Sequence, residues 1–159
     1  MAQIAAGTAL FNAEKEAYPH KDKIRDRFNN RLDNGKCREK LNALLKQLGT
    51  SETIDGIAKE VLSSKTGLQI TKSAVPVGAS AAARFNFTIG DRRSIIFNNT
   101  RDYSNEVESF NRDSFDLIHE ILHIANKNNG EYLHEDIVDA IVRMGETTVP
   151  IREALDPVC

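Results

Sequence analysis

The sequence has no tryptophan, two cysteines, and no apolar run that approaches the roughly 18 residues of a membrane-spanning helix. The cysteines, Cys37 and the terminal Cys159, do not form a disulfide framework and indicate little about the compartment. No basic segment followed by a long apolar stretch opens the chain, so no signal peptide is predicted. We therefore expect a soluble protein with no membrane partner, either cytoplasmic or a domain cut from a longer exported chain.

The chain also lacks a large excess of either positive or negative charge. The chain has 21 Lys and Arg residues against 23 Asp and Glu, a net charge of −2, which disfavours a nucleic-acid partner. The first 48 residues nevertheless carry a surplus of four positive charges, and residues 131–159 a surplus of five negative charges. We interpret the basic half as a solvated helical surface, with a docking surface for an acidic partner as the alternative.

A length of 159 residues predicts one domain spanning 1–159. Apolar spacing predicts a helix broken at Pro19 within residues 8–33, then helices at 37–48, where Gly49 ends the pattern, and at 52–62. Strands are predicted at 68–71, 84–89 and 94–97, the last two forming a hairpin, with the small residues 78–83 in a loop. Residues 98–111 show no periodicity.

Two further helices are predicted near the C-terminus. The first is capped by Asp113 or Ser114 and extends to residue 125, and the second covers about residues 132–144. The expected fold class is α+β, with a helical N-terminal half and a small antiparallel sheet.

Histidine is rare but clustered. Of four histidines, His119, His123 and His134 lie close together, while His20 stands alone in a charged region and is expected at the surface. The segment His119-Glu120-Ile121-Leu122-His123 is an HExxH motif inside a predicted helix. Chance alone gives about 0.007 such motifs in a chain of this composition, so the motif indicates a functional site.

The spacing of this motif suits a metal ion. Residues four apart share one helical face, so His119 and His123 can bind one ion, and zinc is the expected cofactor. In zinc hydrolases the glutamate of this motif accepts a proton from the metal-bound water, which assigns Glu120 as the general base.

Zinc with an open coordination position needs a third protein ligand. We favour His134, at the start of the helix that follows Gly130. Glu135 is the main rival, because Asp139 lies one turn further and could support it from the same face. Adjacent helical residues point about 100° apart, so His134 and Glu135 are not both expected to bind. Other candidates are Asp136, Glu131 and Cys37.

Supporting residues carry weaker signals. Tyr132 or Tyr103 could donate a hydrogen bond to the developing oxyanion, although packing explains a tyrosine at either place. Asp116 precedes His119 by three residues and could orient its imidazole, although capping of the helix N-terminus explains it equally well.

Through Leu117-Ile118-His119-Glu120-Ile121-Leu122-His123 the chain resembles the zincin superfamily of zinc metallopeptidases, over about residues 84–144. The order of its features is similar to that of small zincin-like domains at the C-terminal ends of bacterial polymorphic toxins and secreted effectors. The resemblance implies a small sheet packed on the HExxH helix. It also implies that an edge strand, 84–89 or 94–97, pairs with an extended peptide or protein substrate.

The chain departs from the best-known zincin branches. Asn126 and Asn129 occupy the positions where the metzincin pattern has glycine and histidine, and the thermolysin-like branch places its glutamate ligand further on than Glu135. Zinc-dependent peptide hydrolysis is therefore the leading hypothesis. The alternatives are hydrolysis of a non-peptide amide, which a Cys37 ligand would favour, and a non-catalytic zinc-binding interaction domain. The oligomeric state is left open.

Overall fold

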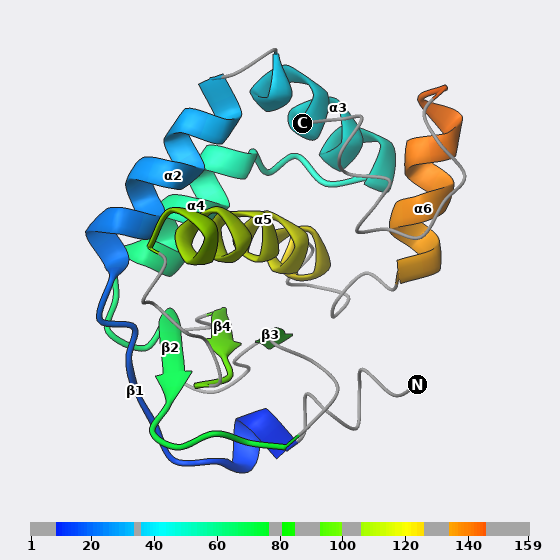
Figure 1. The fold of residues 1–159 in the computed structure, drawn as a ribbon. Coiled ribbons are helices and arrows are strands. Elements are labelled where there is room, and N and C mark those ends of the chain that lie inside the picture. Colours follow the sequence, from blue (N-terminus) through cyan, green and yellow to red (C-terminus); the bar gives the residue numbers. More distant parts are fainter. Residues whose placement is uncertain are drawn as a thin grey trace.

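The computed structural model describes residues 9–33, 36–76, 81–84, 93–99, 106–125 and 134–145. Its elements follow in the order β1 (Lys15–Ala17), α2 (Lys21–Asp33), α3 (Cys37–Leu48), α4 (Ile54–Leu62), β2 (Leu68–Thr71), β3 (Ala81–Arg84), β4 (Ser94–Phe97), α5 (Glu106–Ile124) and α6 (His134–Arg143). The fold is α+β, and α5 lies between the sheet and the other helices (Figure 1).

The described strands form a sheet in the order β1-β2-β4-β3. The outer pairs, β1–β2 and β3–β4, are antiparallel, whereas the central pair, β2–β4, is parallel. The sheet is therefore mixed, and the prediction of an antiparallel sheet was wrong for its central pair. Parallel strands need a crossover connection, and here the chain between β2 and β4 includes β3, which joins the sheet at its edge.

The strand predictions are confirmed for β2 and β4. Of the strand predicted at 84–89, only Arg84 lies within the described residues; it ends β3 and lies opposite Ser94 in an antiparallel pairing. The loop predicted at 78–83 was wrong for residues 81–83, which belong to β3. Alanine has a low strand propensity, so this stretch was expected to be a loop. Ala81 and Ala83 are buried in the main core, where their small side chains allow α5 to approach the sheet closely. The expected turn at 90–91 lies outside the described residues.

The N-terminal region also differs from the prediction. The chain does not form a broken helix across 8–33. A helical turn at 9–12 is followed by β1, which pairs with β2, and then by α2 after Pro19. The charged sequence of β1 shows no strand pattern. Its strand conformation depends on pairing with β2, which the local sequence does not reveal. The turn at 9–12 contributes Leu10 to a second core on the other face of the sheet, with Ala82 and Ile96.

Helices α3 and α4 follow the predicted pattern closely. Helix α3 has the expected bounds, and Gly49 ends it at φ 94° with its N–H directed at the carbonyls of the last turn. Helix α4 begins two residues later than expected, because the Thr53 side chain caps it by accepting the Gly56 N–H at 3.1 Å.

Helix α5 begins at Glu106, well before the predicted start at Asp113 or Ser114. Glu108 and Arg112 form an i,i+4 ion pair at 3.6 Å on the exposed side of this added segment, while Phe110 is buried. Asp113 and Ser114 are buried inside the helix and do not cap it. No described helix is both long and apolar enough to cross a bilayer.

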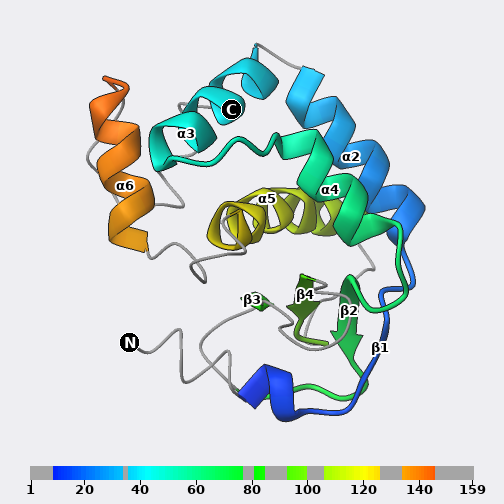
Figure 2. The same cartoon turned by 180° about the vertical axis from the view of Figure 1, so that it is seen from behind.

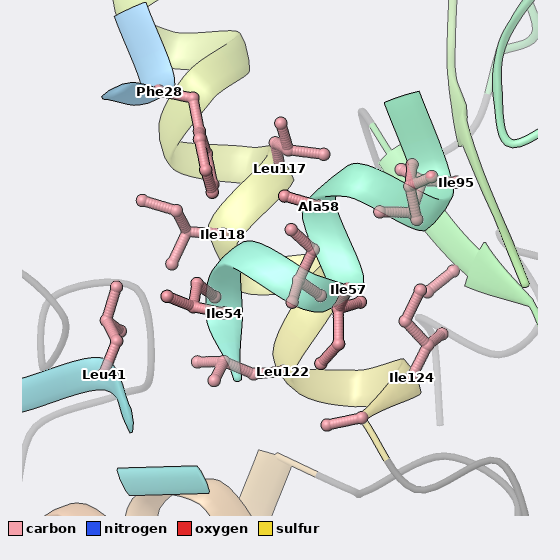
Figure 3. Close-up of a cluster of buried hydrophobic side chains, with 14 of the residues drawn as sticks. Phe28, Leu41, Ile54, Ile57, Ala58, Ile95, Leu117, Ile118, Leu122 and Ile124 are labelled. Atoms are coloured by element: carbon pink, nitrogen blue, oxygen red, sulfur yellow. The ribbon is translucent and has the colours of Figure 1, made fainter. Parts of the chain in front are cut away.

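The main core lies where α2, α3 and α4 meet α5, with β2, β3 and β4 below (Figure 1). Figure 3 shows the apolar side chains of α4 interleaved with those of α5, with Phe28 of α2 and Leu41 of α3 at the rim. Helix α6 packs on α3, at the side of the molecule, through the buried residues Ile137, Ala140 and Ile141 (Figure 2).

Cys37 departs from expectation as well. It is fully buried at the start of α3 and is disulfide-bonded. The sequence contains one other cysteine, Cys159, which lies outside the described residues. The sequence predicted no disulfide framework and gave no sign of this single bond, because sequence separation gives no measure of the distance between two cysteines in the fold.

A backbone contact between α4 and β2 gives a first prediction. Gly67 is buried, and a Cβ at this position would overlap the carbonyl oxygen of Val61. Gly67→Ala should therefore lower the free energy of unfolding by about 1–3 kcal/mol, as expected for overpacking. Gly56→Ala is the matched control, since its Cβ would meet only the Thr53 hydroxyl and alanine favours the helix. Urea unfolding of both variants measures the difference, and equal stability would contradict the close approach.

Candidate metal centre

The last two turns of α5 bring the histidines of the HExxH motif together. The Nε2 atoms of His119 and His123 lie 3.2 Å apart, and the two ring centroids are 5.0 Å apart. Both rings therefore direct the same nitrogen at one point beside the helix. His123 is 4% exposed and His119 is partly exposed, so this point lies at the boundary between the core and the surface.

This separation fits a zinc ion. Two nitrogens bound at about 2.0–2.1 Å to a tetrahedral zinc lie about 3.3 Å apart, and the Nε2 atoms of His119 and His123 are separated by 3.2 Å. The same separation suits an N–H···N hydrogen bond when one ring carries its proton on Nε2. The distance is thus compatible both with a hydrogen bond between the two rings and with two ligand bonds to one ion.

Buried polar side chains continue along α5 from the two histidines. Glu120 is 4% exposed, Asp116 is 8% exposed, and Asp113 is fully buried. Because α5 begins at Glu106, Asp116 lies in the middle of the helix, and capping of the N-terminus no longer explains it. Carboxylates are seldom buried without a specific partner, so this stripe makes α5 the candidate functional helix among the described elements.

Tyr18 and His20 pack beside this stripe. The Tyr18 hydroxyl, 2% exposed, donates to Oδ2 of Asp113 at 2.5 Å. The ring of His20 lies edge-on to Tyr18 at 5.9 Å and to Phe110 at 5.2 Å. His20 is thus partly exposed, as expected for a residue near the surface, but it also packs against two aromatic rings, which the sequence did not predict. The contacts hold the segment before α2 against α5.

At the other end of α5 two side chains bind its final carbonyls. Arg93 Nη1 donates to the Ile124 carbonyl at 2.8 Å, and Thr50 Oγ1 donates to the Ala125 carbonyl at 3.2 Å. Neither Arg93 nor Thr50 was predicted from the sequence to contact α5. An arginine directly before an apolar strand is a weak signal for a buried charge, and nothing local connects residues 50 or 93 with α5.

The described residues include only some of the candidates for the third ligand. His134 is the first residue of α6, but its side chain lies outside the described residues. The side chains of Glu135 and Asp136 are exposed, as is that of Asp139. Within the described part of the chain, no three His, Cys, Asp or Glu side chains gather to hold an ion. Glu131, Tyr132 and Tyr103 also lie outside the described residues.

Cys37 is withdrawn from the candidate ligands. A cysteine binds zinc as a thiolate, and a sulfur held in a disulfide offers none. The amide-hydrolase alternative that depended on a Cys37 ligand loses its support. So does a structural zinc site that would use this residue.

Comparison of the chain with protein-family models, with curated proteins and with solved structures found no match.

The two histidines give a second prediction. His119→Asn and His123→Asn should each weaken zinc binding at least about 100-fold, because each removes one ligand of a chelate. His20→Asn is the matched control, since this histidine packs at the far end of α5 between aromatic rings. Competition with a chromogenic chelator measures the dissociation constants. Equal affinity in wild type and the His123 variant would contradict a site at this pair.

Proposed function

We propose that the protein is a zinc-dependent hydrolase of peptide bonds, with the HExxH segment of α5 as its active site. The observation that carries the proposal is the 3.2 Å separation of the His119 and His123 Nε2 atoms, on a buried helix that also holds Glu120. His119 and His123 would supply two ligands, and His134 the third. His134 is chosen from the sequence, as the first residue of the helix that follows α5 along the chain.

The chemistry divides between the ion and the chain. Zinc held by these histidines would supply a water molecule of lowered pKa and polarise the scissile carbonyl. Glu120 accepts the proton of the attacking water and later delivers it to the leaving amine, which becomes a neutral amine. Glu120 follows His119 directly in the sequence and is almost fully buried, so few alternative water contacts compete for its carboxylate.

The sheet suggests how the substrate is presented. Strand β3 is an edge strand, antiparallel to β4, and it packs against α5. Of the two edge strands considered from the sequence, 94–97 is excluded, because β4 lies between β2 and β3. The opposite edge, β1, carries Lys15 and Glu16, charges of the kind that discourage further strand pairing. Strand β3 carries one charge, at its last residue Arg84, and three alanines before it, so we propose that an extended substrate backbone pairs along β3.

Glu120 provides the third prediction. Glu120→Gln should bind zinc within about 10-fold of wild type and unfold at a similar urea concentration, while peptide cleavage falls at least about 100-fold, the range of general-base contributions. Glu108→Gln is the matched control, an exposed glutamate of the same helix, and should retain wild-type activity. Mass spectrometry of a peptide library incubated with each zinc-loaded protein gives the rates. Cleavage by the Glu120 variant at the wild-type rate would overturn the mechanism.

The disulfide at Cys37 bears on the compartment. Disulfides persist in oxidising environments and are rare in the cytosol, so we propose that the protein acts outside a reducing cytoplasm. This favours the exported member of the two localisations considered from sequence. It also agrees with a peptidase domain carried by a secreted effector or toxin.

Thiol labelling provides the fourth prediction. In protein isolated from an oxidising compartment and unfolded without reductant, a maleimide should label neither cysteine, and reduction should expose both. The reduced protein should unfold at lower urea concentration, because a disulfide restricts the unfolded chain. Cys37→Ser without reductant should show the same lower stability as the reduced wild type. Full labelling of the unreduced protein would contradict the proposed compartment.

A further inference from the structure

Arg93 is an unusual core residue. It lies directly before β4, is 2% exposed, and is the bulkiest of the fully buried side chains among the described residues. A guanidinium moved out of water is costly unless charges and hydrogen bonds compensate it. Its position in the core therefore requires a set of partners, and these partners belong to three separate parts of the fold.

The partners satisfy the guanidinium on every side. Nη1 donates to Glu52 at 2.9 Å and Nη2 contacts the same carboxylate at 2.8 Å, while Nη2 and Nε bind Glu60 of α4. The second hydrogen of Nη1 is directed at the Ile124 carbonyl of α5 at 2.8 Å. Burial alone would lower the pKa of Arg93, but its bonds to Glu60 and Glu52 outweigh this and raise the pKa. The side chain thus links β4, α4 and the end of α5 as a permanent cation.

Thr50 binds the adjacent carbonyl of α5. Its hydroxyl donates to Ala125 at 3.2 Å and accepts the Glu52 N–H at 3.1 Å. The last carbonyls of a helix have no partner within it, and the final turn frays unless other groups bind them. Here two neighbouring carbonyls are bound from two directions, and a positive charge lies at the negative end of the helix dipole.

The bound carbonyls belong to the turn that holds the metal ligands. His123 precedes Ile124 directly, and its Nε2 remains 3.2 Å from that of His119 only while this turn keeps its helical geometry. Unwinding of one turn would rotate His123 away from His119. Removal of an interaction that orients a ligand typically weakens metal binding 10- to 100-fold, so the anchoring of this turn is expected to matter for affinity.

We propose that Arg93 and Thr50 are positioning residues, which hold the last turn of α5 so that His119 and His123 converge on the metal ion. The proposal rests on the proposed zinc function. Neither residue touches the reacting atoms. Their effect reaches His123 through the backbone carbonyls of Ile124 and Ala125, and the ion pairs with Glu52 and Glu60 fix the guanidinium in place.

Four variants test the proposal. Arg93→Lys keeps the charge but loses the planar fork, Thr50→Val removes the hydroxyl, and Thr50→Ser restores it. Arg38→Lys is the matched control, because Arg38 of α3 also binds two carboxylates, but these are Asp33 of α2 and Asp55 of α4, and neither belongs to α5. Zinc dissociation constants are measured by chelator competition. Amide hydrogen exchange of the metal-free proteins is measured across α5.

Arg93→Lys and Thr50→Val should each raise the zinc dissociation constant about 10-fold. In both variants the amides at the end of α5 should exchange at least about 10-fold faster, while those around Asp113 keep the wild-type rate. Thr50→Ser and Arg38→Lys should match wild type in both measurements. If Arg93→Lys does not fold, Thr50→Val with its serine rescue decides the question.

Two failures are distinguishable. Unchanged exchange at the end of α5 in Thr50→Val and Arg93→Lys would overturn the positioning role, whatever the zinc affinity. Equal acceleration along the whole of α5 would also overturn it, because that result describes general destabilisation. Absence of zinc binding by the wild-type protein would overturn the proposed function, and the exchange measurement would still decide whether Arg93 and Thr50 hold the last turn.

Discussion

Helix α5 carries carboxylates and imidazoles through the middle of the molecule, and its neighbours are arranged around that requirement. A buried polar group is tolerated only when it has a partner, so the elements beside α5 must supply polar atoms as well as apolar surface. Tyr18 meets Asp113 at one end, and Arg93 and Thr50 bind the carbonyls at the other. Between these contacts, apolar residues of α2 and α4 cover the helix.

These contacts are expected to hold the two histidines more rigidly than an isolated helix would. An isolated helix would present the two histidines one turn apart, but its last turn would fray. In the fold, the two carbonyls that follow His123 accept hydrogen bonds from Arg93, which precedes β4, and from Thr50, in the loop before α4. A metal site built on such a helix loses little conformational freedom when the ion binds, because its ligands already lie close to their bound positions.

Sequence patterns predicted the elements whose signals are local. The apolar spacing of 37–48 and the terminal Gly49 gave α3, and the i,i+4 spacing of His119 and His123 gave the candidate site, because both depend on the geometry of one helix. The alanines of β3 and the charges of β1 gave no strand signal, since those strands depend on pairing across the sheet. Asp113 resembled a helix cap, but α5 begins seven residues earlier and Asp113 accepts a hydrogen bond from the distant Tyr18.

The pairing of the strands also constrains how the chain can fold. Residues of β1 pair with β2 more than 50 positions along the chain, and β2 pairs in parallel with β4 after a long excursion through β3. Each of these contacts requires closure of a long loop before any stabilisation is gained, which slows folding relative to helical proteins of similar size. Helices α2, α3 and α4 follow one another in sequence and can form early. We therefore expect the sheet beneath α5 to form late and to limit the rate of folding.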